Sequence, residues 1–333
     1  MSFSRYNTED SVISSETVVR GLFSGDSNVL NGSSVNTSSY TEYYLNVYNG
    51  DPASSGSAVQ FSIQYGNLKG SGSALINASV PGYTPSRVIY GEYRNLVYGT
   101  ETTNFSFDGT TDSNDIFVIN VARGRYKESL LPGSFGLTLG SGSNGSKISL
   151  IDDSSTTNLT RFIGENRYFN IISGSNGSYF TSGSATTYYG LFFPDLDIIV
   201  LNANALTSSF NGTGSYVNYN TGSTVAYNNT NLLTSIINGA VTSSFTLKSS
   251  ETVSARYFFT RIKNGEYNYT TNPSIIDENG NLLYTTLVNN PQTYITTVGM
   301  YNDNNELLAV AKLSKPLIKD FTKEALIRVK LDY

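Results

Sequence analysis

Short apolar or aromatic runs alternate with Gly, Ser and Asn along this chain, and this pattern predicts strands joined by turns rather than amphipathic helices. Residues 43–48 end at Asn49-Gly50, residues 59–65 alternate between apolar and polar, and residues 116–121 are apolar on both faces. We expect these three strands to lie in one layered core. The sequence therefore predicts a mainly β protein with β-sandwich-like domains.

A short helix is predicted at residues 85–98, packed on the sheet. Thr84 is a suitable N-cap, Pro85 suits the first turn, and Gly99 marks the end. The apolar stripe expected to face the sheet consists of Ile89, Tyr93, Leu96 and Val97.

The middle of the chain repeats one turn sequence. Ser-Gly-Ser-Asn-Gly-Ser occurs at 141–146 and 173–178, and Asn-Gly is a strong hairpin signal because both residues tolerate positive φ. Strands are predicted at 188–193 and 198–201. Residues 203–230 are expected to form a surface excursion or a loop ordered by a partner. Directly after this segment, a second short helix is predicted at 231–237, closed by Asn238-Gly239, although its helix propensity is mediocre.

The segment after Lys248 is predicted to be a compact β module. Its strands are expected at 257–262, 293–298, 307–313 and 325–331, with polar turns at 277–280 and 302–305. Small and apolar residues alternate with charged ones in the last strand, so we expect the C-terminus to be a structural strand rather than a tail.

The amino-acid composition excludes several kinds of catalytic and metal site. The 333 residues include 25 Tyr and 17 Phe but no His, Cys or Trp, which excludes disulfides, Ser-His-Asp triads and zinc fingers. The net charge of −5 disfavours nucleic acid as a partner. No run approaches the roughly 18 apolar residues of a membrane span, and no apolar leader opens the chain. We therefore expect a soluble protein made in the cytoplasm, without membrane insertion.

Few segments suggest a catalytic or ligand site. Residues 140–147 resemble a phosphate-binding loop, but the Lys falls one place late and a strand is expected to follow, so a hairpin turn is preferred. Residues 277–281 and 303–306 offer oxygen ligands for calcium, yet their spacing favours ordinary turns. The carboxylate pairs Asp152-Asp153 and Asp195/Asp197 could be nominated for glycoside hydrolysis, but solvated turns are the preferred interpretation. We expect no enzyme, cofactor or metal.

Residues 168–247 carry only two formal charges, Asp195 and Asp197, among many Ser, Thr, Asn, Gly and Tyr residues. Such a surface suits packing against other protein copies, because it contains few ions that are costly to desolvate. Its tyrosines are alternatively suited to stacking on sugar rings. The contact residues predicted are Tyr188, Tyr189, Phe192, Phe193, Arg123, Arg125 and Arg261.

Three segments carry a resemblance to known proteins: residues 85–96, residues 115–128 and most of 256–333. They resemble a family of virion structural proteins from large contractile-tailed bacteriophages. Residues 298–311 also look like a hairpin found in tail-fibre and baseplate-attachment domains. The resemblance implies a discontinuous β scaffold of residues 1–150 and 250–333, with 151–249 as an inserted β domain or elaborated loops.

The resemblance implies a non-enzymatic structural component of the virion, in the baseplate or fibre-attachment region of a contractile tail. Its partners would be other virion proteins and further copies of itself in a ring. The alternatives are a glycan-binding protein of a tail fibre and a neck or head-surface structural protein. A third reading, cleavage of polysaccharide by paired carboxylates, would make the chain an enzyme.

Overall fold

The chain folds into two compact units. Unit 1 comprises residues 1–17 and 252–333, and unit 2 comprises residues 18–251. The fold is mainly β, as the sequence predicts. The computed structural model describes residues 5–23, 31–37, 40–73, 84–107, 112–140, 145–157, 160–175, 178–179, 187–209, 219, 227–239, 244–268 and 273–332.

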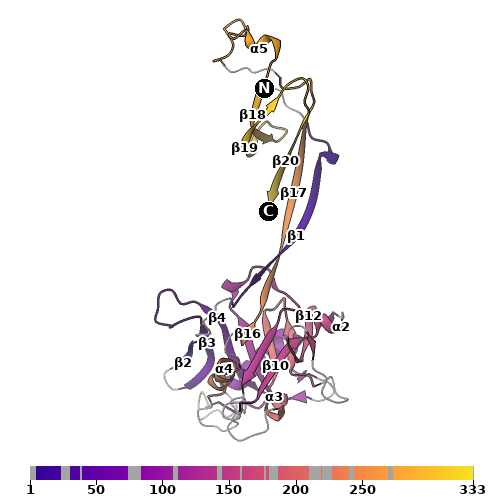
Figure 1. Cartoon of the computed structure of the whole chain (residues 1–333). Helices are drawn as coiled ribbons and strands as arrows, with labels where there is room; N and C mark the ends of the chain where they lie inside the picture. The colour runs from indigo at the N-terminus through magenta and orange to yellow at the C-terminus, as the bar shows by residue number, and fades with distance from the viewer. Residues whose placement is uncertain are drawn as a thin grey trace. The chain divides into compact units, whose positions relative to one another are not determined.

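Unit 2 is built on a large, curled antiparallel sheet (Figure 1). Its main path runs β16-β9-β10-β12-β14-β15-β7-β4-β3-β2, and β11 and β13 each pair with β12. The bounds of the strands of unit 2 are β2 (Asn31–Thr37), β3 (Tyr40–Tyr48), β4 (Val59–Asn67), β5 (Phe105–Ser106), β6 (Asp112–Ser113), β7 (Asp115–Val121), β8 (Ser129–Leu130), β9 (Gly136–Gly140), β10 (Lys147–Asp152), β11 (Arg161–Ile163), β12 (Asn166–Ser175), β13 (Ser178–Tyr179), β14 (Gly190–Phe193), β15 (Ile198–Asn202) and β16 (Phe245–Thr246).

Both faces of the central strands of this sheet are buried. In β7, Phe117 and Ile119 belong to one apolar core, whereas Ile116 and Val118 belong to the other. The three strands expected to share a core are the neighbours β3, β4 and β7. Side chains alternate between the faces of a strand, so continuous apolar sequence is what a strand covered on both sides requires.

Helices cover the two faces of the sheet. α1 (Pro85–Tyr98) contributes to the core that contains Ile116, while α3 (Ala203–Ser209) and α4 (Asn228–Ile237) contribute to the core that contains Phe117. The shorter helical segments of unit 2 are α2 (Ser154–Thr157) and the 3-10 turn at Arg123–Arg125. In the described residues no helix is both long enough and apolar enough to cross a membrane.

The helix predicted at 85–98 is confirmed as α1, and both of its predicted ends are correct. Thr84 accepts a hydrogen bond from the Arg87 backbone N–H, and Gly99 adopts the left-handed conformation at φ 67°. The predicted buried face is wrong at one position, because Leu96 is 47% exposed and Tyr90 is buried instead. The Tyr90 hydroxyl donates to the Ser113 carbonyl, which lets this large side chain occupy the core.

The second predicted helix is also confirmed. It begins at Asn228, three residues before the prediction. The loop expected at 203–230 begins instead with α3, and residues 210–218 and 220–226 of that prediction lie outside the described residues. Both repeated turn sequences join antiparallel strands, although their central residues 141–144 and 176–177 lie outside the described residues as well.

The structure divides the chain differently from the predicted scaffold and insertion. Strands β12, β14 and β15 come from the segment 151–249, yet they lie in the middle of the sheet, between β10 and β7. Residues 18–150 belong to the same unit as this segment. The scarcity of charge in these strands therefore reflects burial on both faces of a central sheet rather than a separate interaction domain.

Unit 1 is a smaller β structure. β1 (Ser11–Gly21) and β17 (Lys248–Ile262) have residues in both units, and the sheet order is β1-β17-β20, with β8 pairing with β17 inside unit 2. The predicted C-terminal strand is confirmed as β20 (Ala325–Asp332). The remaining elements are the 3-10 turn at Thr8–Asp10, α5 (Thr286–Asn289), β18 (Thr293–Tyr301) and β19 (Leu307–Lys319).

A buried lysine ties the end of β19 to a neighbouring loop. Lys319 is 0% exposed, and its ammonium donates to the Asn264 carbonyl at 2.9 Å, to Asn268 Oδ1 at 2.7 Å and to the Asp320 carbonyl at 2.9 Å. Three acceptors satisfy all three donors of the ammonium. The charge is therefore stabilised by hydrogen bonds even though it is removed from water.

Candidate interaction surface

The aromatic residues predicted to contact other subunits lie inside unit 2. Phe192 and Phe193 are each 0% exposed, and they point into the two different cores of the sheet. Tyr189 is 8% exposed and Tyr188 is half-buried against the core that contains Phe193. The reason is that β14 lies inside the sheet, between β12 and β15, and each of its faces packs against one of the two apolar cores. These aromatics act in the core rather than at a surface.

The three predicted arginines are not brought together. Arg123 lies over the Tyr126 ring at 4.5 Å from its centroid, and Arg125 donates to the Leu22 carbonyl at 2.6 Å. Both belong to unit 2, and Arg123 stays exposed. Arg261 belongs to unit 1, where its exposed guanidinium pairs with Glu324 at 2.8 Å. Hydrogen bonding to Glu324 raises the pKa of Arg261. Each arginine therefore has local contacts within its own unit.

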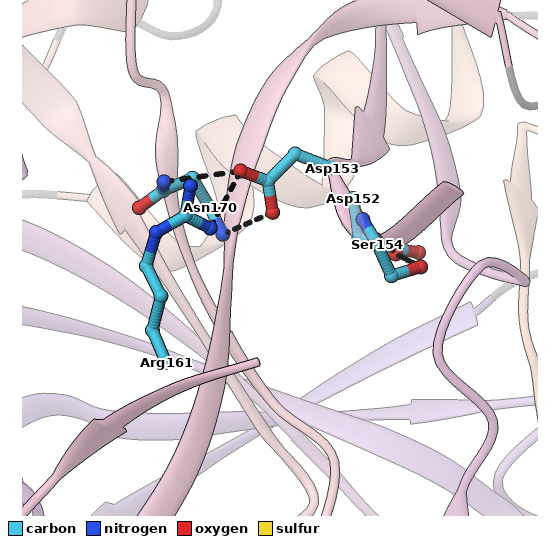
Figure 2. Close-up of polar contacts among 5 residues, drawn as sticks. All are labelled: Asp152, Asp153, Ser154, Arg161 and Asn170. Carbon is cyan, nitrogen blue, oxygen red and sulfur yellow. Dashed lines mark hydrogen bonds and ion pairs between the residues drawn. The ribbon is translucent and has the colours of Figure 1, made fainter. Parts of the chain in front are cut away.

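The carboxylate of Asp152 serves as an acceptor for backbone groups. Asp152 is 1% exposed and accepts hydrogen bonds from the N–H groups of Gly133 at 2.8 Å and Phe135 at 3.2 Å. The Ser154 hydroxyl and N–H also donate to Asp152, and Figure 2 shows this side chain turned toward Ser154. These bonds hold the segment before β9 against the end of β10.

Asp153 points to the other side of the chain, toward Arg161 and Asn170 (Figure 2). It is 3% exposed and accepts from Arg161 at 2.8 Å, from the Asn170 backbone N–H at 2.9 Å and from Asn170 Nδ2 at 3.1 Å. Glycoside hydrolysis requires two carboxyl groups that converge on a substrate. The pair Asp152-Asp153 diverges and is occupied by structural hydrogen bonds, so its geometry favours a structural role.

Asp195 and Asp197 lie in the turn between β14 and β15 but in different environments. Asp195 is partly exposed and accepts two hydrogen bonds from Arg167, at 2.8 Å and 3.1 Å. Asp197 is 7% exposed, has φ 60°, and its Oδ1 has no hydrogen-bond partner among the residues that the structure describes. Burial raises the pKa of Asp197 to about 6, against the opposing effects of Tyr126 and Arg123. Burial likewise raises the pKa of Tyr126 to about 12. No sequence signal distinguished the two carboxylates.

The exposed apolar side chains of unit 1, taken together here as its apolar surface, are the feature that the sequence analysis missed. Among the described residues, sixteen of the twenty-two large apolar side chains that stay exposed belong to unit 1, although unit 2 is much the larger unit. They are Tyr6, Val12, Ile13, Tyr267, Leu283, Tyr284, Val288, Tyr294, Tyr301, Leu307, Leu308, Val310, Leu317, Ile318, Phe321 and Leu326.

The core of unit 1 is correspondingly small. Its buried cluster contains Ile262, Met300, Ala325, Ile327 and Val329, with partly buried neighbours from β17, β18, β19 and β20. The inner face of the β18–β19 hairpin supplies Ala309 and Ala311 to this cluster. On the outer face of β19, Leu308 is 69% exposed and Val310 is 58% exposed. The hairpin is therefore apolar on both sides, and only one side is covered within the described residues.

No protein-family model, curated protein or solved structure matches this chain. Among the described residues, no group of three or more acidic side chains is placed to hold a metal ion. The segments considered for calcium form the turns that their spacing favours, and Asp277 accepts hydrogen bonds there from the N–H groups of Asn279 and Asn281. These hydrogen bonds, together with one from the Asn281 side chain, lower the pKa of Asp277.

Proposed function

We propose that this chain is a non-enzymatic structural subunit of a tailed-bacteriophage virion. Its place would be the baseplate or the fibre-attachment region of a contractile tail, where it contacts other virion proteins and further copies of itself. The resemblance of residues 85–96, 115–128 and 256–333 to virion structural proteins supports this proposal. The observation that carries it is the apolar surface of unit 1.

That surface is difficult to explain in an isolated subunit. Soluble monomers seldom expose large contiguous apolar patches, because water in contact with apolar surface is unfavourable. In its described residues, unit 1 leaves sixteen large apolar side chains exposed and has five residues in its buried cluster. Protein neighbours would cover this surface, and obligate interfaces often bury more than about 2,000 Å². A subunit whose exposed apolar side chains are buried by neighbouring subunits is what we expect of a particle component.

The alternatives have less support. The glycan-binding reading depends on Tyr188 and Tyr189, and Tyr189 is buried in the core. The polysaccharide-cleaving reading depends on carboxylate pairs, and Asp152 and Asp153 are engaged in structural hydrogen bonds. The hypothesis of a neck or head-surface protein predicts the same kind of interface and differs only in where the chain lies in the particle.

The test is to locate the chain in purified particles. Antibodies against the chain, followed by gold labelling and electron microscopy, are expected to mark the end of the tail distant from the head. Gold at the head or neck would contradict the baseplate location and support the alternative of a neck or head-surface structural protein. Absence of the chain from purified particles, by labelling and by mass spectrometry of the particle proteins, would overturn the proposed function.

A further inference from the structure

Lys319, at the end of β19, faces the side-chain amide of Asn268. Its Nζ donates to Asn268 Oδ1 at 2.7 Å, and the two residues are buried at 0% and 5% exposure. A C=O bond is about 1.23 Å long, so Nζ lies roughly 3–4 Å from the amide carbon Cγ. Atoms about 3–3.5 Å apart are close enough to react when the fold holds them there. The contact therefore places an amine nitrogen against an amide carbonyl in a site without water access.

One backbone carbonyl anchors both nitrogen atoms of this contact. The Asn264 oxygen accepts from Lys319 Nζ at 2.9 Å and from Asn268 Nδ2 at 2.6 Å. Nζ is the nitrogen that can attack Cγ, and Nδ2 is the nitrogen that would leave it. Because both are hydrogen-bonded to the same oxygen, the two nitrogens are held close together on one side of the amide.

The backbone beside Asn268 is strained. Tyr267, directly before Asn268, has φ 53°, a conformation that is costly for a bulky side chain. Thr293, which lies opposite Lys319 in the β18–β19 ladder, donates its hydroxyl hydrogen to the Tyr267 carbonyl at 2.5 Å. Such strain persists only where the surrounding structure imposes it. The fold therefore holds the Asn268 side chain against Lys319.

The Lys319 ammonium has no carboxylate to neutralise it. The adjacent acidic residue, Asp320, pairs with Lys323, and in the described part of the chain no carboxylate forms an ion pair with Lys319. Removing a charge from water without an opposite charge beside it is unfavourable, even where hydrogen bonds satisfy its donors. A reaction that carries this charge out of the protein is favoured for that reason.

We propose that Lys319 and Asn268 join in an intramolecular isopeptide bond. A bond forms between Lys319 Nζ and Asn268 Cγ, and the bond between Cγ and Nδ2 breaks. Two protons move from Nζ to Nδ2, which leaves as ammonium and takes the positive charge with it. Atoms and charge balance without an oxidant, a cofactor or a second substrate. This modification goes beyond the proposed structural function and does not depend on it.

The bond would reinforce the unit that has the smaller apolar core. It joins residues 51 positions apart, and so ties the loop after β17 to the end of β19. In its described residues, unit 1 has five residues in its buried cluster, and the chain has no cysteine from which a disulfide could form. A cross-link that closes a long loop stabilises a fold by restricting its unfolded chain. An isopeptide bond supplies that restriction without sulfur.

Mass spectrometry of the purified, denatured chain tests for the bond. We expect the chain to weigh less than its sequence requires by the mass of one ammonia. Trypsin should then release residues 264–312 joined to residues 313–323, uncut after Lys319, and fragmentation of this branched peptide should locate the link at Asn268. A succinimide at an Asn-Gly sequence loses the same mass but joins no peptides. A chain that gives separate, unmodified peptides for Lys319 and Asn268 would overturn the proposal.

Variants assign the mass loss to these two residues. Lys319→Met removes the amine and Asn268→Ala removes the amide, so each variant should have its full expected mass and give no branched peptide. Lys263→Met is the matched control, because it removes an exposed lysine of the same unit and should keep the branched link. The measurement on the parent chain stands even where a variant folds poorly. A branched link that persists in Lys319→Met would also overturn the proposal.

Discussion

Two acidic residues in one turn show how strongly local environment sets the behaviour of a side chain. Asp195 is held by Arg167 near the surface, whereas Asp197 is buried and hydrogen-bonded to Tyr126. Asp197 also has φ 60°, a conformation that Asp and Asn tolerate better than most other residues. Its neighbours Arg123 and Asp195 influence its charge with opposite signs.

The first prediction concerns the pH dependence of stability at Asp197. Its pKa rises from 3.8 to about 6 in the folded protein, so the folded state binds a proton more tightly than the unfolded state. The resulting stabilisation is complete below about pH 4 and is lost as pH rises through 6, a change of roughly 3 kcal/mol. Asp197→Asn, which keeps the backbone conformation accessible, should remove this decrease and be more stable at pH 7.

The measurement is urea unfolding by circular dichroism between pH 4 and 8. Asp195→Asn serves as the control, because its side chain is about half exposed and should change stability little. The same pH dependence in Asp197→Asn and in the parent protein would show that Asp197 does not cause it.

The second prediction concerns Asp152. Asp152→Ala would leave the buried N–H groups of Gly133 and Phe135 without their acceptor. We expect a loss of roughly 3 kcal/mol or more in the free energy of unfolding, measured by urea denaturation. Asp195→Ala, which removes a partly exposed ion pair, should cost about 1 kcal/mol or less. Equal losses would indicate that the Asp152 hydrogen bonds contribute little.

At the scale of elements, close backbone contacts fix where α4 lies. A Cβ atom added to Gly239 would come within 1.8 Å of the Thr138 carbonyl oxygen in β9. A Cβ atom at Gly140 would come within 2.4 Å of the Asn238 carbonyl oxygen. The end of α4 and the end of β9 therefore touch through backbone alone, and Ser235 adds a hydrogen bond to the Gly140 carbonyl at 2.8 Å.

The third prediction follows from this contact. Gly239→Ala must displace α4 or β9, and we expect it to destabilise the protein by about 3 kcal/mol in urea denaturation. Gly91→Ala is the matched control, because Gly91 lies within α1 and has open space around its Cβ position. That control should stabilise the protein by about 0.5–1 kcal/mol, since Ala favours helix more than Gly does. A neutral Gly239→Ala would contradict the close contact.

Elements were more predictable from the sequence than their arrangement. The caps Thr84 and Gly99 act locally, so the ends of α1 follow from a few adjacent residues. The burial of Tyr90 in place of Leu96 depends on the distant Ser113 carbonyl, which no local pattern contains. The same limit explains Phe192 and Phe193. Their apolar sequence indicates a buried strand, but whether this chain or a neighbouring subunit buries them depends on the distant residues that form the two cores.

At the scale of the whole molecule, the two units differ in how completely they bury their apolar residues. The central strands of unit 2, such as β7, are covered on both faces, whereas the β18–β19 hairpin of unit 1 is covered on one face. Local stability depends on the buried apolar contacts of each region. The small apolar cluster of unit 1 should therefore open more often than the cores of unit 2.

The fourth prediction is a difference in hydrogen exchange between the units. Amides of β18 and β19 should exchange faster than those of β7 and β15 in dilute protein. Mass spectrometry of peptic fragments measures the exchange of each strand. Equal exchange in the two units would contradict this prediction.

The exposed apolar side chains of unit 1 make association depend on abundance, because neighbouring copies are the proposed cover for them. Formation of a pair increases with the square of the subunit concentration, so newly made copies would remain single while they are scarce and would pair as they accumulate. No ligand, covalent step or separate signal is needed for this transition. The rate at which the cell synthesises the chain would then set the moment at which assembly begins.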